Sequence, residues 1–293
     1  MRTPLCALLL AGCPGEVVSS AVLHGAEGRS APSATPPPDT ASRLRAAIAA
    51  ERGRTVAHVD PLGEGPGALD PDPEGPAPVV DCVTWVQQVL ARAVADAPGD
   101  AAIAAALRRI RYFAGVPGFG TRKHFVDSWL AWDPWPLRRM ALPPGAADVR
   151  VRLMPRRVGA ARGYRGAYVG GDAPVVDVPY LRRDDTAAWA RAVPEGVFLL
   201  AAVAGPAWHA DHNDGLGDMA QTHLLFLDTA ARPTVWHASI TAGDVRGEPL
   251  DAYLERVEGT FVGFVPWAMA PGSPRTAPGW VRDEAARVVA AGG

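Results

Sequence analysis

The stretch Val79-Val80-Asp81-Cys82-Val83-Thr84-Trp85-Val86-Gln87-Gln88-Val89-Leu90 changes from a short apolar run to a helical pattern at its third residue. Asp81 is suited to be the N-cap, because its carboxylate can accept hydrogen bonds from the unpaired N–H groups of the first turn. Cys82 would then begin the helix, where the helix dipole and the backbone donors stabilise a thiolate and lower the cysteine pKa. We therefore expect Cys82 to be a nucleophile; the alternative is a buried, small apolar residue.

Composition sets the broad class of the protein. The chain has 293 residues, 48% of them hydrophobic, which is enough for one substantial core. Lys and Arg number 29 and Asp and Glu 31, so no charge excess points to a nucleic acid or an anionic membrane surface. We expect a globular protein with no nucleic-acid partner.

The amino terminus has the pattern of an export signal. Residues 1–20 combine a positive start with a short apolar run and are predicted to be a signal peptide. Leu10-Ala11-Gly12-Cys13 is similar to the lipobox of bacterial lipoproteins, which implies lipidation of Cys13; secretion with cleavage near Ser19 to Ala21 is the alternative. Residues 21–39, rich in Pro, Ser, Gly and Ala, are predicted to be a tether, and residues 40–293 a single domain. We expect an exported protein of the bacterial cell envelope or periplasm, with membrane contact only through such an anchor.

The cysteine count favours a reactive role for Cys82. The other two cysteines, Cys6 and Cys13, lie in the leader. If Cys6 is removed and Cys13 is acylated, Cys82 is the sole thiol and no disulfide can form within the mature chain. An unpaired cysteine in an exported protein is more typical of reactivity than of structure.

The hydrophobic pattern places helices first and strands afterwards. Helical spacing predicts helices from Thr40 to near Gly53, from Cys82 to about Ala97 and over 103–110. Strands are expected at 147–153, 175–180, 197–203, 221–228, 234–239 and 257–265, before a closing helix at 280–291. This order predicts an α+β fold with an antiparallel sheet rather than alternating βαβ units.

Two histidines fall on neighbouring strands of the expected sheet. His223 and His237 flank a turn around 229–233, so a hairpin would bring their side chains together on one face. Cys82 would be the nucleophile, His223 its base, and His237 the group that holds His223 in the useful tautomer. Backbone N–H groups at the start of the Cys82 helix would face the oxyanion of the tetrahedral intermediate.

Five blocks of the sequence resemble the N-acetylmuramoyl-L-alanine amidase-like family within the NlpC-type cell-wall cysteine hydrolases. They are Asp81 to Gln87, Arg111-Tyr112 with Gly115, Thr121 to Phe125 with Trp129, Thr222-His223 with Trp236 to Ser239, and Leu250 to Leu254. The resemblance implies a papain-like fold over 40–293, with the nucleophile at a helix start packed on an antiparallel sheet that carries the histidines.

By motif, the resemblance places a Cys-His-His triad on Cys82, His223 and His237. It implies hydrolysis of the amide between N-acetylmuramic acid and L-Ala in peptidoglycan or a muropeptide, without a cofactor.

Substrate-binding residues are expected near the helix start and in the segment that follows. We predict that Trp85, Tyr112, Arg122 and His124 bind substrate; for Arg122 and His124 the alternative is packing or surface exposure. Trp85 and Gln87 stand where the family usually has Phe and Glu. The loss of a carboxylate at Gln87, about one helical turn from Cys82, could alter the substrate or the thiol pKa.

Three other functions fit the sequence. A stem-peptide endopeptidase would use the same mechanism, and a cell-wall-binding lipoprotein without activity would use the same cleft. A metal-dependent hydrolase would use a polar loop before His223 that matches no zinc motif. We assign no metal ligand to this loop, because a solvated polar loop explains it better. Its polar residues are His209, Asp211, His212, Asp214 and Asp218.

Overall fold

The structure is a computed structural model of the whole chain. It describes residues 38–57, 77–112, 115–117, 123, 126, 129–130, 134–152, 175–211 and 220–270. The chain divides into two compact units, Met1–Ser33 and Ala34–Gly293, and every described residue lies in the second. The expected signal peptide, Cys13, nearly all of the tether and the closing helix at 280–291 lie outside the described residues. Within the described part, none of the helices is both long enough and apolar enough to cross a membrane.

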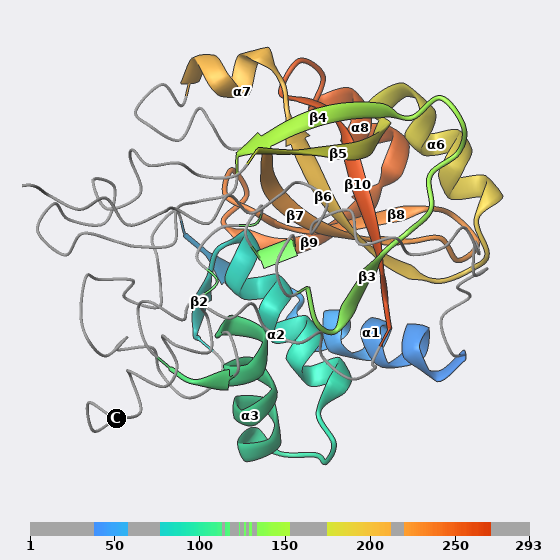
Figure 1. Cartoon of the computed structure of the whole chain (residues 1–293). Coiled ribbons are helices and arrows are strands. Elements are labelled where there is room, and N and C mark those ends of the chain that lie inside the picture. Colours follow the sequence, from blue (N-terminus) through green and yellow to red (C-terminus); the bar gives the residue numbers. More distant parts are fainter. Residues whose placement is uncertain are drawn as a thin grey trace, which may run out of the picture. The chain divides into compact units, whose positions relative to one another are not determined.

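The described elements begin with helices and continue with strands (Figure 1). In chain order they are α1 (Pro38–Glu51), β1 (Thr55–Val56), β2 (Val79–Val80), α2 (Cys82–Val94), α3 (Asp100–Arg111), β3 (Leu137–Arg139), β4 (Ala147–Arg152), β5 (Val175–Arg182), α6 (Arg183–Ala192), β6 (Val197–Ala204), α7 (Pro206–Asp211), β7 (Gln221–Asp228), β8 (Thr234–Ser239), β9 (Asp244–Pro249), α8 (Leu250–Arg256) and β10 (Phe261–Met269).

One sheet joins all the described strands in the order β2-β1-β9-β8-β7-β6-β10-β5-β4, with β3 also paired to β10. Among these strands only β1 and β2 run parallel; the other neighbouring strands are antiparallel. The prediction of an α+β fold with a mostly antiparallel sheet is therefore confirmed.

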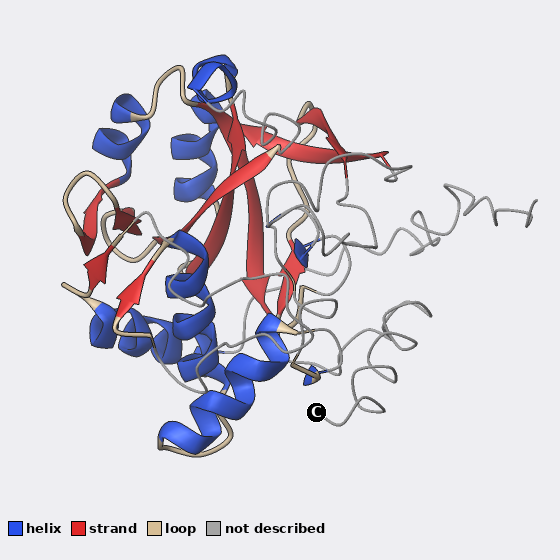
Figure 2. Cartoon of the chain, turned by 90° about the vertical axis from the view of Figure 1, so that its left-hand side faces the viewer, coloured by secondary structure: helices blue, strands red, loops and turns tan. Residues whose placement is uncertain are grey.

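Helices cover both faces of the sheet (Figure 2). On one face, apolar side chains of α1, α2 and α3 pack on the strands in what we call the helical-side core. On the other face, side chains of α6 and α8 do so in the far-side core. Strand β6 is buried along its whole length, because its alternate residues enter the two cores. Burial on both faces explains why its sequence is continuously apolar.

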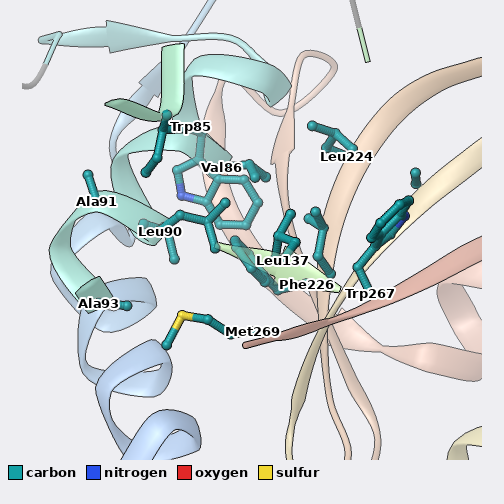
Figure 3. Close-up of a cluster of buried hydrophobic side chains, with 14 of the residues drawn as sticks. Trp85, Val86, Leu90, Ala91, Ala93, Leu137, Leu224, Phe226, Trp267 and Met269 are labelled. Atoms are coloured by element: carbon teal, nitrogen blue, oxygen red, sulfur yellow. The ribbon is translucent and has the colours of Figure 1, made fainter. Parts of the chain in front are cut away.

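An aromatic contact fixes α2 on the sheet. Trp85 of α2 is 0% exposed, and its ring meets that of Phe226 of β7 edge to face, with centroids 5.4 Å apart. Figure 3 shows Trp85 within the helical-side core, together with Leu90, Leu137 and Phe226. Such edge-to-face pairs stabilise a contact by about 0.5–1.5 kcal/mol beyond the area they bury.

Several element boundaries differ from the predicted ones by one to four residues. Helix α1 begins at Pro38, inside the expected tether, and α2 ends at Val94 because Ala95 leaves the helical region of backbone angles. The last strand is Phe261–Met269 rather than 257–265, because residues 257–260 turn away from α8. Gly259, with a φ of 78°, allows that turn.

A buried carboxylate joins α1 to α2. Glu51, whose side chain is 0% exposed, accepts a hydrogen bond from Arg92 Nε at 2.7 Å and another from Arg54 Nη2 at 3.2 Å. Arg54 also donates to the carbonyl oxygen of Ala77 at 2.8 Å, just before β2. These contacts hold α1 and the approach to Cys82 against α2.

Replacement of Glu51 by Ala should therefore lower the free energy of unfolding by about 3 kcal/mol, because it leaves two arginines without their buried partner. Glu195→Ala is the matched control: Glu195 pairs with Arg45 at 3.1 Å but is 65% exposed, so its loss should cost no more than about 1 kcal/mol. Urea denaturation of both variants measures the difference. Equal losses would show that Glu51 acts as an ordinary surface charge.

Candidate active site

The helix that carries Cys82 begins where the sequence predicted. Asp81 has extended backbone angles and caps α2, since its Oδ1 accepts the backbone N–H of Thr84 at 2.7 Å. Thr84 Oγ1 in turn accepts the backbone N–H of Asp81 at 2.9 Å, which completes a capping box. Cys82 is thus the first residue of α2, and it is half-buried.

Strands β7 and β8, which lie beside the first turn of α2, diverge from each other near that turn. The β7–β8 ladder pairs Asp228 with Thr234, Leu227 with Val235 and Phe226 with Trp236, and stops there. His223 and His237 lie on the parts of β7 and β8 beyond the last pair. Helix α2 contacts both strands.

The thiol of Cys82 lies against the part of β7 that is paired with β6 but not with β8. The backbone of Leu224, the residue after His223, makes a hydrogen bond that favours the Cys82 thiolate, as do the backbone groups of Cys82 and Val83. The ring of Tyr253 of α8 lies 5.4 Å from that of His237. The structure therefore places the Cys82 thiol beside the strand segment that carries His223, while the rings of His223 and His237 contact Phe261 and Tyr253 of the far-side core.

Aromatic contacts set the planes of the two histidine rings. The ring of His223 stacks on Phe261 of β10, with centroids 5.9 Å apart and planes 9° from parallel. His223 and His237 are neighbours, with centroids 6.3 Å apart and planes at 72°. The predicted proximity of the two histidines on a hairpin is confirmed.

The hydrogen bond of His237 goes to an acidic residue that the sequence analysis did not identify. His237 Nε2 lies 2.7 Å from Glu248 Oε1 of β9, and Arg256 of α8 donates to the same oxygen. A sequence signal for Glu248 existed. Gly243 marks a tight turn, and the resulting β8–β9 hairpin pairs His237 with Arg246, which places Glu248 on the same face as His237.

The ionisation of Cys82 differs from the prediction. Burial, with the negative charge of Asp81 second, raises the pKa of the Cys82 thiol to about 12. The backbone hydrogen bonds at the helix start act in the expected direction and lower the pKa, but they do not compensate. The expectation of a thiolate stabilised at neutral pH was therefore wrong, because burial of the thiol, together with the negative charge of the cap, outweighs the backbone donors.

Both histidines are held neutral as well. Burial lowers the pKa of His223 to about 3, and the charges of His237 and Arg256 act in the same direction. Burial also lowers the pKa of His237, against the opposing effect of Glu248. At neutral pH the thiol and both imidazoles are thus uncharged, in contrast to the thiolate that was predicted at the helix start.

Two of the expected substrate-binding residues are core residues. Trp85 is 0% exposed and Tyr112 is 2% exposed, so neither ring is available on a surface that a substrate could touch. Trp85 instead packs on Phe226. Arg122 and His124 lie outside the described residues, as do the side chains of the polar loop from His209 to Asp218. Among the side chains that are described, no group of three or more His, Cys, Asp or Glu could hold a metal ion.

Gln87, the position of the departure from the family pattern, faces a buried arginine. Arg111 is 2% exposed, and its Nε donates to Gln87 Oε1 at 3.2 Å. A carboxylate at this position would lie beside Arg111 in the core. Gln87 is itself 3% exposed and belongs to the packing of α2 on α3.

The chain was compared with families of known proteins. Residues 75–142 match the model of the N-acetylmuramoyl-L-alanine amidase-like (AmiA-like) family. The resemblance to this amidase-like family is thereby confirmed. The matched segment contains Cys82 and all of α2 and α3, and it ends before the strands of His223 and His237. No curated protein sequence matches the chain.

Solved structures share the fold at low sequence identity. A Legionella pneumophila protein of the DUF1460 family is 20% identical, with a TM-score of 0.62 over 79% of this chain and 89% of its own. An N-acetylmuramoyl-L-alanine amidase from Bacteroides uniformis is 16% identical, with a TM-score of 0.51 over 78% of this chain and 98% of its own. A Bacteroides fragilis protein described as a candidate xylanase is 17% identical, with a TM-score of 0.53 over 76% of this chain and 99% of its own. At these identities the likeness concerns the fold alone.

The raised pKa of Cys82 predicts how its thiol reacts. Alkylation by iodoacetamide needs the thiolate, so its rate at Cys82 should be low at pH 7 and rise about tenfold per pH unit up to pH 10 without a plateau. Mass spectrometry of the Cys82 peptide after timed alkylation measures the rate, with free cysteine as the reference. A plateau with a midpoint below pH 8 would instead show a thiolate–imidazolium pair.

Proposed function

We propose that the protein is a cysteine-dependent peptidoglycan amidase of the NlpC-type, papain-like class, which hydrolyses the amide between N-acetylmuramic acid and L-Ala. The observation that carries the proposal is the position of Cys82. It begins a capped helix in the segment that matches the amidase-like family, and its thiol lies against the residue next to His223. The name of the Bacteroides uniformis neighbour agrees with this substrate.

In the first half of the reaction, the Cys82 sulfur attacks the carbonyl carbon of the lactyl amide while His223 takes the thiol proton. Because the resting pair is neutral, proton transfer accompanies the attack instead of preceding it. The backbone N–H groups at the start of α2 stabilise the oxyanion of the tetrahedral intermediate. When the C–N bond breaks, His223 returns its proton to the amine of L-Ala, and a thioester joins Cys82 to the lactyl group.

In the second half, water attacks the thioester carbonyl carbon and His223 accepts a proton from the water. The carbon–sulfur bond then breaks, the sulfur recovers the proton, and the muramic acid carboxylate leaves. His237 orients His223 through both halves. No cofactor takes part in these steps.

We further propose that the protein acts in the cell envelope, exported by residues 1–20 and held by the tether of residues 21–39, with lipidation of Cys13 as the anchor. Substrate contacts come from residues near the helix start, among them Arg122 and His124. The substrate is peptidoglycan or a muropeptide released from it.

The decisive experiment is mass spectrometry of muropeptides before and after incubation with the purified full chain. We expect a new free amino terminus on L-Ala, and at least a thousandfold loss of its formation in Cys82→Ala, since nucleophile removal costs about that much or more. EDTA should leave the activity unchanged.

The alternatives give other results in the same assay. A new terminus further along the stem peptide would favour an endopeptidase over the amidase. Loss of activity in EDTA but not in Cys82→Ala would favour metal-dependent hydrolysis at the loop before His223. Co-sedimentation with peptidoglycan and no released product would favour a binding lipoprotein.

A further inference from the structure

The contact between His237 and Glu248 decides where the His237 ring carries its proton. A carboxylate accepts hydrogen bonds and does not donate them, and Glu248 is held ionised: partial burial acts to raise its pKa, but Arg256 and His237 outweigh this and lower it. At 2.7 Å, an unprotonated Nε2 would place its lone pair against the carboxylate oxygen. His237 therefore has its proton on Nε2 when neutral.

Arg256 is the competing partner for the same nitrogen. Its Nη2 lies 3.5 Å from His237 Nε2, at the limit of a hydrogen bond, and it could donate only to an unprotonated Nε2. The hydrogen bond of His237 Nε2 is therefore the shorter one, to Glu248. Arg256 donates to Glu248 Oε1 instead. Arg256 also lies over the ring of Tyr253, 5.1 Å from its centroid, which fixes the guanidinium.

The opposite nitrogen of the ring then has a defined role. With Nε2 protonated, Nδ1 of His237 is a hydrogen-bond acceptor. A base that takes a proton from Cys82 needs one unprotonated nitrogen toward the thiol, so His223 must carry its own proton on the other nitrogen and donate it. The ring of His237 is the neighbour of His223, with centroids 6.3 Å apart. Hydrogen bonds of this kind are often long in unliganded enzymes and tighten with substrate.

We propose that Glu248, held by Arg256, is a positioning residue for the hydrolysis: it fixes the Nε2–H tautomer of His237, which leaves Nδ1 to accept the proton of His223. The catalytic part of this inference rests on the proposed function. The order of groups is Glu248, His237, His223 and Cys82, contributed by β9, β8, β7 and α2. Other charges near His237 are those of Asp244 and Arg246 on β9, which pair with each other at 2.7 Å.

The tautomer can be measured without any substrate. Long-range proton–nitrogen correlation spectra of the full chain, labelled with ¹⁵N-histidine, distinguish the two neutral forms of each ring, and a His237→Gln variant assigns the signals. We expect the Nε2–H form for His237 at pH 7. The Nδ1–H form, or an equal mixture, would overturn the proposal.

Variants then test the role in catalysis. In Glu248→Ala, Arg256 is the remaining polar partner of Nε2 and can only donate, so we expect a switch to the Nδ1–H form and a loss of kcat on the order of tenfold to a hundredfold, part of the effect of general acid–base catalysis. KM should stay within about twofold, because the substrate contacts are unchanged. Glu248→Gln keeps an accepting oxygen, so it should retain the Nε2–H tautomer and most of the activity that Glu248→Ala loses. Glu255→Ala, an exposed neighbour on α8, is the matched control and should behave as wild type.

The results separate this inference from the proposed function. If the wild-type chain cleaves muropeptides and Glu248→Ala does so equally fast, Glu248 is not a positioning residue although the amidase proposal stands. If the wild-type chain forms no product and His237 shows the expected tautomer, the amidase proposal fails while the Glu248–His237 pairing holds.

Discussion

The early end of the β7–β8 ladder is the constraint on which the site depends. An antiparallel pair that continued past Phe226 and Trp236 would use the backbone of Leu224 in strand pairing. Because the ladder stops, that backbone can face Cys82 at the start of α2. The separation is supported from both sides of the sheet, by Trp85 of α2 against Phe226 in one core and by Tyr253 of α8 against His237 in the other.

The helix start combines two requirements that oppose each other. A capped helix needs an acceptor for its first N–H groups, and Asp81 provides one at the cost of a negative charge beside the Cys82 thiol. The backbone donors of the first turn favour a thiolate, while burial and Asp81 favour the thiol. The net effect is a raised pKa, so Cys82 is a thiol and not a thiolate at neutral pH. The start of a helix therefore positions a cysteine well for attack, but the capping residue and the depth of burial decide whether its sulfur is charged.

The sequence predicted those parts of the molecule that depend on local pattern. The Asp81 cap follows from hydrogen-bonding needs of one turn, and β6 from an unbroken apolar run. Strand β9 has no apolar or alternating pattern, because its Asp-Val-Arg-Gly-Glu-Pro sequence is mostly polar. The strand was therefore not predicted, and neither was the role of Glu248. Trp85 was misplaced for a different reason: an aromatic residue near a nucleophile can point into a cleft or into the core, and only the packing against Phe226 decides between them. The pKa of Cys82 depends on burial in the folded chain, which periodicity does not measure.

The neutral state of Cys82 also has a consequence for its chemical lifetime. Peroxides and foreign disulfides react with thiolates, so a sulfur that is protonated at rest is oxidised slowly even though it is partly exposed and forms no disulfide in the described chain. In the proposed mechanism, an activated thiolate would be at risk of oxidation for the whole time between substrates. Proton transfer that accompanies attack would instead confine the reactive form of the sulfur to the moments when an amide carbonyl is in place. The same burial that slows the free thiol would thus protect it from oxidation between turnovers.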